Sequence, residues 1–176
     1  LAESARSMKS LPLGVTSSFQ HWDPYPISIV SAQGAWMTDV DGRQLLDLSM
    51  GFGAMLAGHL NPVVVEEVKA SLDTGMLFVT PSPISTDAAE RICRRFGIDQ
   101  IRFTNSGTES TMYAVRVARS ATGKRDIVKV EGGYHGSYDP FVVSAKPKLD
   151  AAGDAEFPTP VVDEKLVAGN VHVVPY

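Results

Sequence analysis

The sequence has very little cysteine and no long apolar run. Cys93 is the only cysteine, so no disulfide can form within the chain, and the sequence is compatible with a reducing compartment. No stretch is apolar for long enough to cross a membrane. The first residues lack the charged-then-apolar order of a secretion signal. We therefore expect a cytoplasmic protein with no membrane partner.

Positive charge is also scarce. Lys and Arg together number 16 against 20 Asp and Glu, which gives a net charge of −4. Because the basic residues form no cluster, we expect no nucleic-acid partner. The sequence has no internal repeat and no low-complexity tract. With 44% apolar and 20% charged residues, it has the composition of a soluble globular protein long enough to bury one core.

A turn that begins at Asn105 is the central feature of what is present. The pattern predicts a short buried strand at 101–104, a tight turn at Asn105-Ser106-Gly107 and then a helix. The first backbone N–H groups of a helix have no partners within it, and they lie at the positive end of its dipole. Gly107 allows a close backbone approach, and the hydroxyls of Ser106 and Thr108 add donors. A phosphate group would fit there.

The same turn has a plainer interpretation. Ser106 and Glu109 have the spacing of a capping box, in which the serine caps the helix and the glutamate reaches back to the cap residue. A short Ser/Gly/Thr turn is a weak motif, so on this turn alone both interpretations stay open.

A second candidate loop follows the apolar run at 127–130. Three glycines surround the Tyr134-His135 pair. Such a loop suits the carboxyl end of a parallel strand, where ligands bind in open α/β sheets. A tyrosine ring there can stack on a flat cofactor, and a histidine can hydrogen-bond beside it. The alternative is an ordinary surface turn.

Alternating strands and helices predict an α/β fold with a parallel sheet and right-handed crossovers. The expected strands lie at 100–104, 127–130 and 171–175. The expected helices lie at 1–9, from Asn61-Pro62 to Gly75, from Thr86-Asp87 to Phe96, and from the central turn to Ala121.

The N-terminal part has a different pattern. Asp41-Gly42 between the stretches 35–39 and 44–48 predicts a β-hairpin. We assign residues 1–50 to an N-terminal arm or small-domain segment, and residues 51–176 to the first part of a large α/β domain. The stretch at about 137–163 is long for a connection, which is typical of a lid, a binding loop or a disordered segment.

The ordered motifs resemble the class III aminotransferases, which use pyridoxal phosphate (PLP). The resemblance covers nearly the whole chain and is greatest to the branch containing glutamate-1-semialdehyde aminomutase. It implies the N-terminal half of a PLP-dependent transferase of fold type I. The motifs are Val40-Asp-Gly-Arg43, Gly58-His-Leu-Asn-Pro62, Asn105-Ser-Gly-Thr-Glu-Ser110, Arg116-Val-Ala-Arg-Ser-Ala-Thr-Gly123 and Lys129-Val-Glu-Gly-Gly-Tyr-His-Gly136.

The resemblance implies a set of residues around the cofactor and no metal site. The phosphate group would be bound by the central turn, and the ring would stack on the tyrosine of the second loop. The residues are Ser106, Gly107 and Thr108 for the phosphate, Tyr134 for the ring, and His135 and Glu131 beside them.

Two further residues are implied for the substrate pocket. Phe52 matches an aromatic that lines the pocket, although ordinary core packing is an equal alternative. Gln20 stands near the place of an arginine that pairs with a substrate carboxylate. Because glutamine cannot form a bidentate ion pair, this departure counts against glutamate semialdehyde as the substrate.

The resemblance also implies partners. They are a small amino donor and acceptor, and a second subunit in a homodimer. The loop at 75–83 would lie at that interface, and the segment 137–163 would be a mobile gate over the active site.

Two groups that PLP chemistry needs have no counterpart here. In the family, the lysine that forms a Schiff base with PLP and the acid paired with the pyridine nitrogen come later in the chain. No lysine of this sequence lies in the family's lysine motif. We therefore expect the front half of an enzyme that transfers an amino group on a small amino or keto compound, as an aminotransferase or aminomutase.

The alternative is a non-catalytic domain, truncated or completed by a second chain, that keeps the fold and the phosphate-binding turn. A nucleotide-binding oxidoreductase is not supported, because no Gly-x-Gly-x-x-Gly follows a strand.

Overall fold

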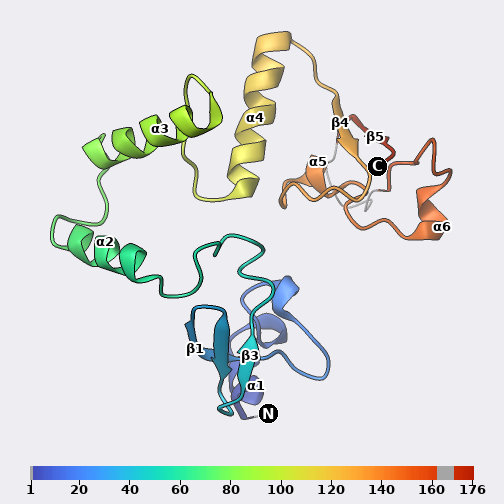
Figure 1. Ribbon diagram of the computed structural model, residues 1–176. Coiled ribbons are helices and arrows are strands. Elements are labelled where there is room, and N and C mark those ends of the chain that lie inside the picture. Colours follow the sequence, from blue (N-terminus) through green and yellow to red (C-terminus); the bar gives the residue numbers. More distant parts are fainter. Residues whose placement is uncertain (1, 162–168) are drawn as a thin grey trace. The chain divides into compact units, whose positions relative to one another are not determined.

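The computed structural model describes residues 2–161 and 169–176 (Figure 1), and its chain divides into two units. The first unit is Leu1–Pro81 and the second is Ser82–Tyr176. This division follows contacts within the chain. It does not test the assignment of 1–50 and 51–176 to two domains of a complete enzyme, which stays a prediction.

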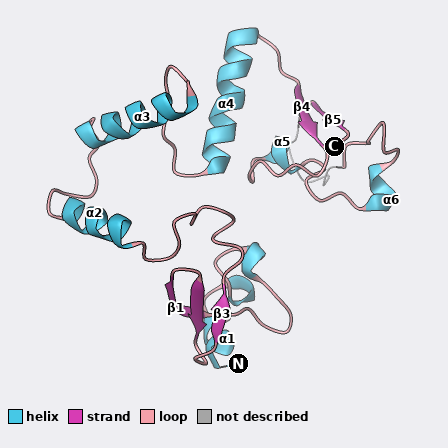
Figure 2. Cartoon of the chain, in the orientation of Figure 1, coloured by secondary structure: helices cyan, strands magenta, loops and turns pink. Residues whose placement is uncertain are grey.

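The first unit is built on a small antiparallel sheet. Its strands are β1 (Ile29–Gln33), β2 (Trp36–Asp39) and β3 (Gln44–Leu46), in the order β1-β2-β3 (Figure 2). The β2–β3 hairpin confirms the prediction made from Asp41-Gly42, while β1 was not predicted. The other elements of the unit are helices α1 (Ala2–Ser7) and α2 (Pro62–Leu72), and the short 3₁₀ turns η1 (Pro12–Gly14) and η2 (Ser18–Gln20).

The hairpin turn is held by one carboxylate. Asp39 is 2% exposed, and its Oδ1 accepts hydrogen bonds from the backbone N–H groups of Asp41 at 3.0 Å and Arg43 at 2.8 Å. Its Oδ2 accepts a third bond from Arg43 Nε at 2.8 Å. Gly42 takes the φ of 82° that the turn requires and that other residues rarely adopt. Asp39 thus fixes this corner through local hydrogen bonds, and Gly42 supplies the backbone conformation that the Asp-Gly signal predicts.

The second unit combines two longer helices with a parallel strand pair. Helices α3 (Pro83–Phe96) and α4 (Gly107–Thr122) precede β4 (Ile127–Val130), and the short helices α5 (Asp139–Val142) and α6 (Leu149–Ala152) precede β5 (Val171–Val174). Strands β4 and β5 pair in parallel, with Ile127 opposite Val171 and Val130 opposite Val174. The predicted parallel α/β pattern is confirmed for this pair.

One predicted strand is wrong. Residues 101–104 form no strand, and they are not the buried segment that was expected, because Ile101 is 36% and Phe103 is 51% exposed. A strand needs a neighbour to satisfy its N–H and C=O groups, and within the described ranges no segment pairs with this one.

The core of the second unit lies beneath the loop that follows β4. Val143 is fully buried, Phe141 is 5% exposed, and Val171 is 9% exposed. Ser144 N donates to Val161 O at 2.9 Å, and Val161 N donates back to Ser144 Oγ at 2.8 Å. The start of the predicted gate segment is therefore packed into the core. The end of that segment, residues 162–163, lies outside the described residues, and the gate stays a prediction.

Within the ranges that the structure covers, no helix combines the length and the apolar character needed to cross a membrane.

The start of α2 provides a test of the local signals. Asn61 Oδ1 accepts hydrogen bonds from Val63 N at 3.1 Å and Val64 N at 3.4 Å. We expect Asn61→Ala to lower the free energy of unfolding by about 1 kcal/mol, because the first turn loses its cap. Asn61→Ser, which keeps a side-chain acceptor, should recover most of this loss. Urea unfolding of both variants measures the difference, and equal stabilities would contradict the capping role.

Candidate functional site

The first turn of α4 is capped and still has donors to offer. Ser106 Oγ accepts the N–H of Glu109 at 3.2 Å, and Glu109 Oε2 accepts the N–H of Asn105 at 2.7 Å. The capping box is therefore present, although the glutamate reaches one residue further back than predicted. Among the described residues, the N–H groups of Gly107 and Thr108 have no hydrogen-bond partner. Capping and anion binding are thus compatible in this turn.

The turn lies directly against the loop that follows β4. A Cβ atom built on Gly136, whose φ is 101°, would lie 2.4 Å from Thr108 Oγ1 and 2.7 Å from Thr108 Cα. Thr108 Oγ1 also accepts the N–H of Ser137 at 3.2 Å. The structure therefore brings the two candidate motifs into contact, and only glycine fits where they meet.

A residue that sequence reasoning missed fastens the same contact. The Thr111 hydroxyl donates to the carbonyl oxygen of His135 at 2.8 Å. Thr111 follows Thr108 by one helical turn, so both hydroxyls lie on the helix face toward the loop. That spacing was the available signal, but the chain order alone does not show which loop faces the helix.

The loop displays the predicted aromatic pair. Tyr134 is 55% exposed, and the His135 ring makes an edge contact with Phe141, with 6.1 Å between ring centroids. Gly132 N donates to Ser144 O at 2.8 Å, which ties the loop to the core. In this loop the Tyr134 side chain is thus partly exposed to solvent, while the His135 ring packs against Phe141.

Glu131 lies where β4 ends. Its N–H donates to Val174 O at 2.9 Å, continuing the pairing with β5. Its Oε1 is buried and has no hydrogen-bond partner among the described residues. A buried carboxylate oxygen without a partner is costly. The position of Glu131 therefore suits a role that a bound ligand or further protein would complete.

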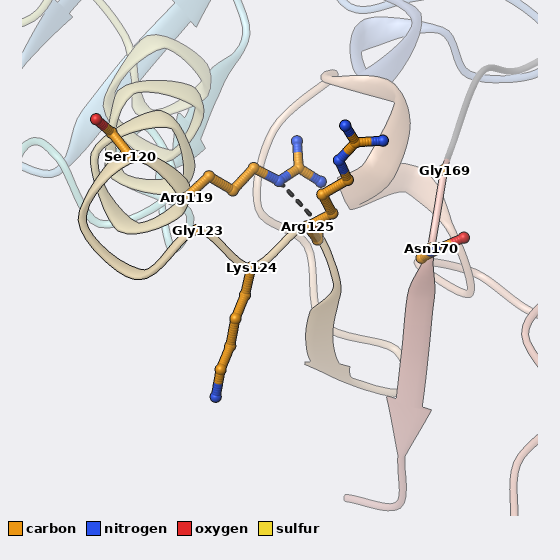
Figure 3. Close-up of a pocket in the computed structure, with 7 residues that line it drawn as sticks. All are labelled: Arg119, Ser120, Gly123, Lys124, Arg125, Gly169 and Asn170. Atoms are coloured by element: carbon orange, nitrogen blue, oxygen red, sulfur yellow. Dashed lines mark hydrogen bonds between the residues drawn. The ribbon is translucent and has the colours of Figure 1, made fainter.

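Two hollows lie at opposite ends of the parallel strands. One, of about 560 Å³, is lined by residues 130–133, His135 and residues 175–176, at the carboxyl end. The other, of about 610 Å³, lies at the amino end and is lined by Arg119, Ser120, Gly123, Lys124, Arg125, Gly169 and Asn170 (Figure 3).

The hollow at the amino end is basic but is a poor candidate for the site. Arg119 Nε donates to the Arg125 carbonyl at 2.9 Å, and Lys124 points away from both guanidinium groups (Figure 3). Cations at the end of α4 complement the negative end of the helix dipole. Because ligands of open α/β sheets bind at the carboxyl ends of the strands, the hollow beside Glu131 and His135 is the better candidate.

The two predicted substrate residues belong to the first unit. Gln20 Oε1 accepts hydrogen bonds from Thr16 N at 3.1 Å and Thr16 Oγ1 at 2.8 Å. Phe52 is 87% exposed, and its ring makes an edge contact with Phe19, with 6.2 Å between centroids. Phe52 is thus no core residue within the described chain, and Phe19 places it near Gln20.

The two ends of the loop that carries Phe52 are held by hydrogen bonds among Gly34, Asp47 and His59. Asp47 Oδ2 lies 2.7 Å from His59 Nε2, and Asp47 Oδ1 accepts the N–H groups of Ser49 at 3.0 Å and Met50 at 2.8 Å. Gly34 and His59 exchange two backbone hydrogen bonds, at 2.9 and 2.8 Å. The hydrogen bond from His59 and the two backbone bonds hold the pKa of Asp47 below its usual value. His59 is therefore a packed residue, and Asp47 is its partner.

No described group of three or more His, Cys, Asp or Glu side chains is arranged to hold a metal ion.

Comparisons with known proteins match this chain to the class III aminotransferases and to aminomutases. The family profile of the class III aminotransferases matches residues 18–160. The glutamate-1-semialdehyde 2,1-aminomutase of Methanothrix thermoacetophila is 38% identical over 97% of this chain and 39% of its own length. That of Methanocorpusculum labreanum is 43% identical over 77% of this chain and 33% of its own length. The chain thus spans between a third and two fifths of these relatives.

Solved structures agree with the relatives. An omega-transaminase from Sphaerobacter thermophilus superposes with a TM-score of 0.92 and 34% identity, over 99% of this chain and 41% of that one. A transaminase with PLP bound superposes with a TM-score of 0.87 and 33% identity, over the same shares. The predicted fold, in its partial form, is confirmed.

The loop closure at Asp47 predicts a pH effect. Because its folded-state pKa is lowered, Asp47 contributes stability above the unfolded pKa of about 3.9, and this contribution is lost as the pH falls through the folded value. We expect the stability advantage of the wild type over Asp47→Asn to shrink between about pH 5 and pH 3. Urea midpoints across this range measure it, with the exposed Asp99→Asn as the control. An advantage that does not change with pH would contradict the interpretation.

Proposed function

Because the chain belongs to the class III aminotransferase family, we propose that it is the front part of a PLP-dependent aminotransferase or aminomutase acting on a small amino compound. The observation that carries this proposal is the contact between the first turn of α4 and the Tyr134-His135 loop, made by Thr108 and Gly136. This contact brings hydrogen-bond donors that suit an anion next to the loop that carries an aromatic side chain, at the carboxyl end of β4.

The donor chemistry of the turn fits a phosphate group. Ser106 Oγ and Thr108 Oγ1 each accept a backbone N–H, from Glu109 and Ser137. A hydroxyl that accepts from the protein keeps its own hydrogen for another acceptor. With the N–H groups of Gly107 and Thr108, the turn therefore offers four donors at a helix N-terminus to one anion.

The loop fits the rest of the cofactor. We assign Tyr134 to the ring face, and His135 and Glu131 to positions beside it. The partial exposure of Tyr134 leaves ring surface for stacking, and the buried oxygen of Glu131 calls for a donor. When bound, PLP supplies the electron sink for amino transfer. These residues bind and orient it, while the lysine and the acid that complete the chemistry are not among them.

The substrate remains a class rather than a compound. Gln20 is uncharged and hydrogen-bonded to Thr16, so it offers no bidentate contact to a carboxylate. This observation disfavours glutamate semialdehyde, although the relatives named above are aminomutases of that substrate. We assign Gln20 and Phe52 to the pocket for a small amino donor or acceptor.

We also propose a cytoplasmic homodimer. The loop at 75–83 supports this proposal, since it carries three apolar side chains that are almost fully exposed. They are Met76 at 84%, Leu77 at 88% and Val79 at 101%. Exposed apolar groups of this density mark interaction surfaces.

The first experiment is a visible absorption spectrum of the full-length protein with PLP, before and after borohydride, with the intact mass of the same sample. We expect a yellow band that borohydride abolishes, and cofactor mass fixed to a polypeptide longer than this chain. Absence of the band would favour the alternative, a non-catalytic domain that keeps the fold.

The phosphate turn gives a second prediction. Thr108→Val removes a hydroxyl donor to a charged group, which is worth about 1.5–3 kcal/mol, so PLP affinity should fall roughly 10- to 150-fold. Thr108→Ser keeps the hydroxyl and should stay near the wild-type value. Dissociation constants from absorbance titration measure both. Unchanged affinity in Thr108→Val would count against the assignment.

A further inference from the structure

Lys129 is a buried cation in the middle of β4. The residue is only 5% exposed, and its Nζ lies within hydrogen-bond distance of three backbone carbonyl oxygens, those of Gly133, Phe141 and Val143. The distances to Gly133 O and Phe141 O are 2.9 and 3.3 Å. Within the described part of the chain, no carboxylate forms an ion pair with it. Sequence reasoning placed this lysine in the strand at 127–130 and at the start of the motif that ends at Gly136, but assigned it no role.

The three carbonyls belong to two different segments, the loop after β4 and the segment at α5. Gly133 immediately precedes Tyr134 in the loop after β4. Phe141 and Val143 belong to α5 and the residue that ends it, in the core below. The Phe141 ring also makes an edge contact with the His135 ring. Lys129 therefore joins the loop that carries the aromatic pair to the segment on which that loop rests.

An ammonium suits this place better than other side chains. It has three N–H donors and no acceptor, and the three carbonyls use all of them. An apolar side chain would leave these buried oxygens without partners, which is costly. Burial lowers the pKa of Lys129, so its charge is held there against a desolvation cost. While its ammonium donates these three hydrogen bonds, Lys129 Nζ has no lone pair with which to act as a nucleophile.

We propose that Lys129 is a positioning residue, which fixes the Gly133 carbonyl and thereby holds the Tyr134 side chain at the angle that meets the cofactor ring. The inference rests on the proposed function for the identity of the ring. It assigns to this lysine a role that is neither the covalent attachment of the cofactor nor contact with its phosphate.

The test compares Lys129→Met with the exposed control Lys124→Met in the full-length protein. We expect Lys129→Met to keep the far-ultraviolet circular dichroism of the wild type, to bind PLP at least tenfold more weakly, and to change the visible dichroic band of the bound cofactor. Lys124→Met should match the wild type in all three. Wild-type affinity with an unchanged visible band in Lys129→Met would overturn the proposal.

A double-mutant cycle separates positioning from general support of the fold. In a Tyr134→Ala background the ring has no tyrosine to meet, so Lys129→Met should cause little further loss of PLP affinity. An undiminished loss in that background would overturn the route through Tyr134. If Lys129→Met does not fold, Lys129→Gln, which keeps two N–H donors, replaces it in the same cycle. Failure of both variants to fold would reduce Lys129 to a structural residue and also overturn the proposal.

A measurement without cofactor distinguishes this inference from the proposed function. Hydrogen–deuterium exchange across residues 131–136 of the PLP-free protein should rise in Lys129→Met and not in Lys124→Met, whether or not PLP is the ligand. A wild type that binds no PLP would overturn the proposed function alone. Unchanged hydrogen–deuterium exchange across residues 131–136 in Lys129→Met would overturn the proposal that Lys129 positions this loop.

Discussion

The second unit depends on how closely the backbone at Gly136 approaches Thr108. A single methyl group at that glycine would lie closer to Thr108 than van der Waals contact allows, so the loop and the helix would have to separate. The hydrogen bonds from Ser137 to Thr108 and from Thr111 to His135 cross the same gap. The first turn of α4 and the loop with Tyr134 and His135 therefore lie together only because position 136 has no side chain.

Much apolar surface of the chain is not covered by any described residue. None of the residues in α2, α3 and α4 is buried. Val63, Ile84, Phe96 and Val117 are each between 65% and 71% exposed. A parallel pair of two strands is likewise far smaller than the sheets of α/β proteins, whose faces are normally covered on both sides. The relatives, of which this chain spans only a part, contain the additional length that such faces need.

Sequence reasoning succeeded where a structure is determined by neighbours in the chain. The caps at Asn61 and Ser106 and the hairpin at Asp41-Gly42 each depend on hydrogen bonds between residues at most four positions apart. It failed at 101–104, because a strand exists only with a partner that the local pattern does not specify. It also missed Thr111 and Lys129, whose contacts reach 24 and up to 14 residues along the chain. The candidate site was thus predictable in its motifs but not in the contacts that hold the motifs together.

The closed base of the Phe52 loop has a consequence for how such a protein can diversify. Gly58 packs against the backbone of Gly34, and a Cβ atom on it would lie 3.2 Å from the Gly34 carbonyl oxygen. The Asp47–His59 contact fixes the other side. Because these anchors lie outside residues 51–57, the side chains of 51–57 can be exchanged without altering the groups that hold the loop. Side chains of this loop can therefore change while the contacts among Gly34, Asp47, Gly58 and His59 stay as they are.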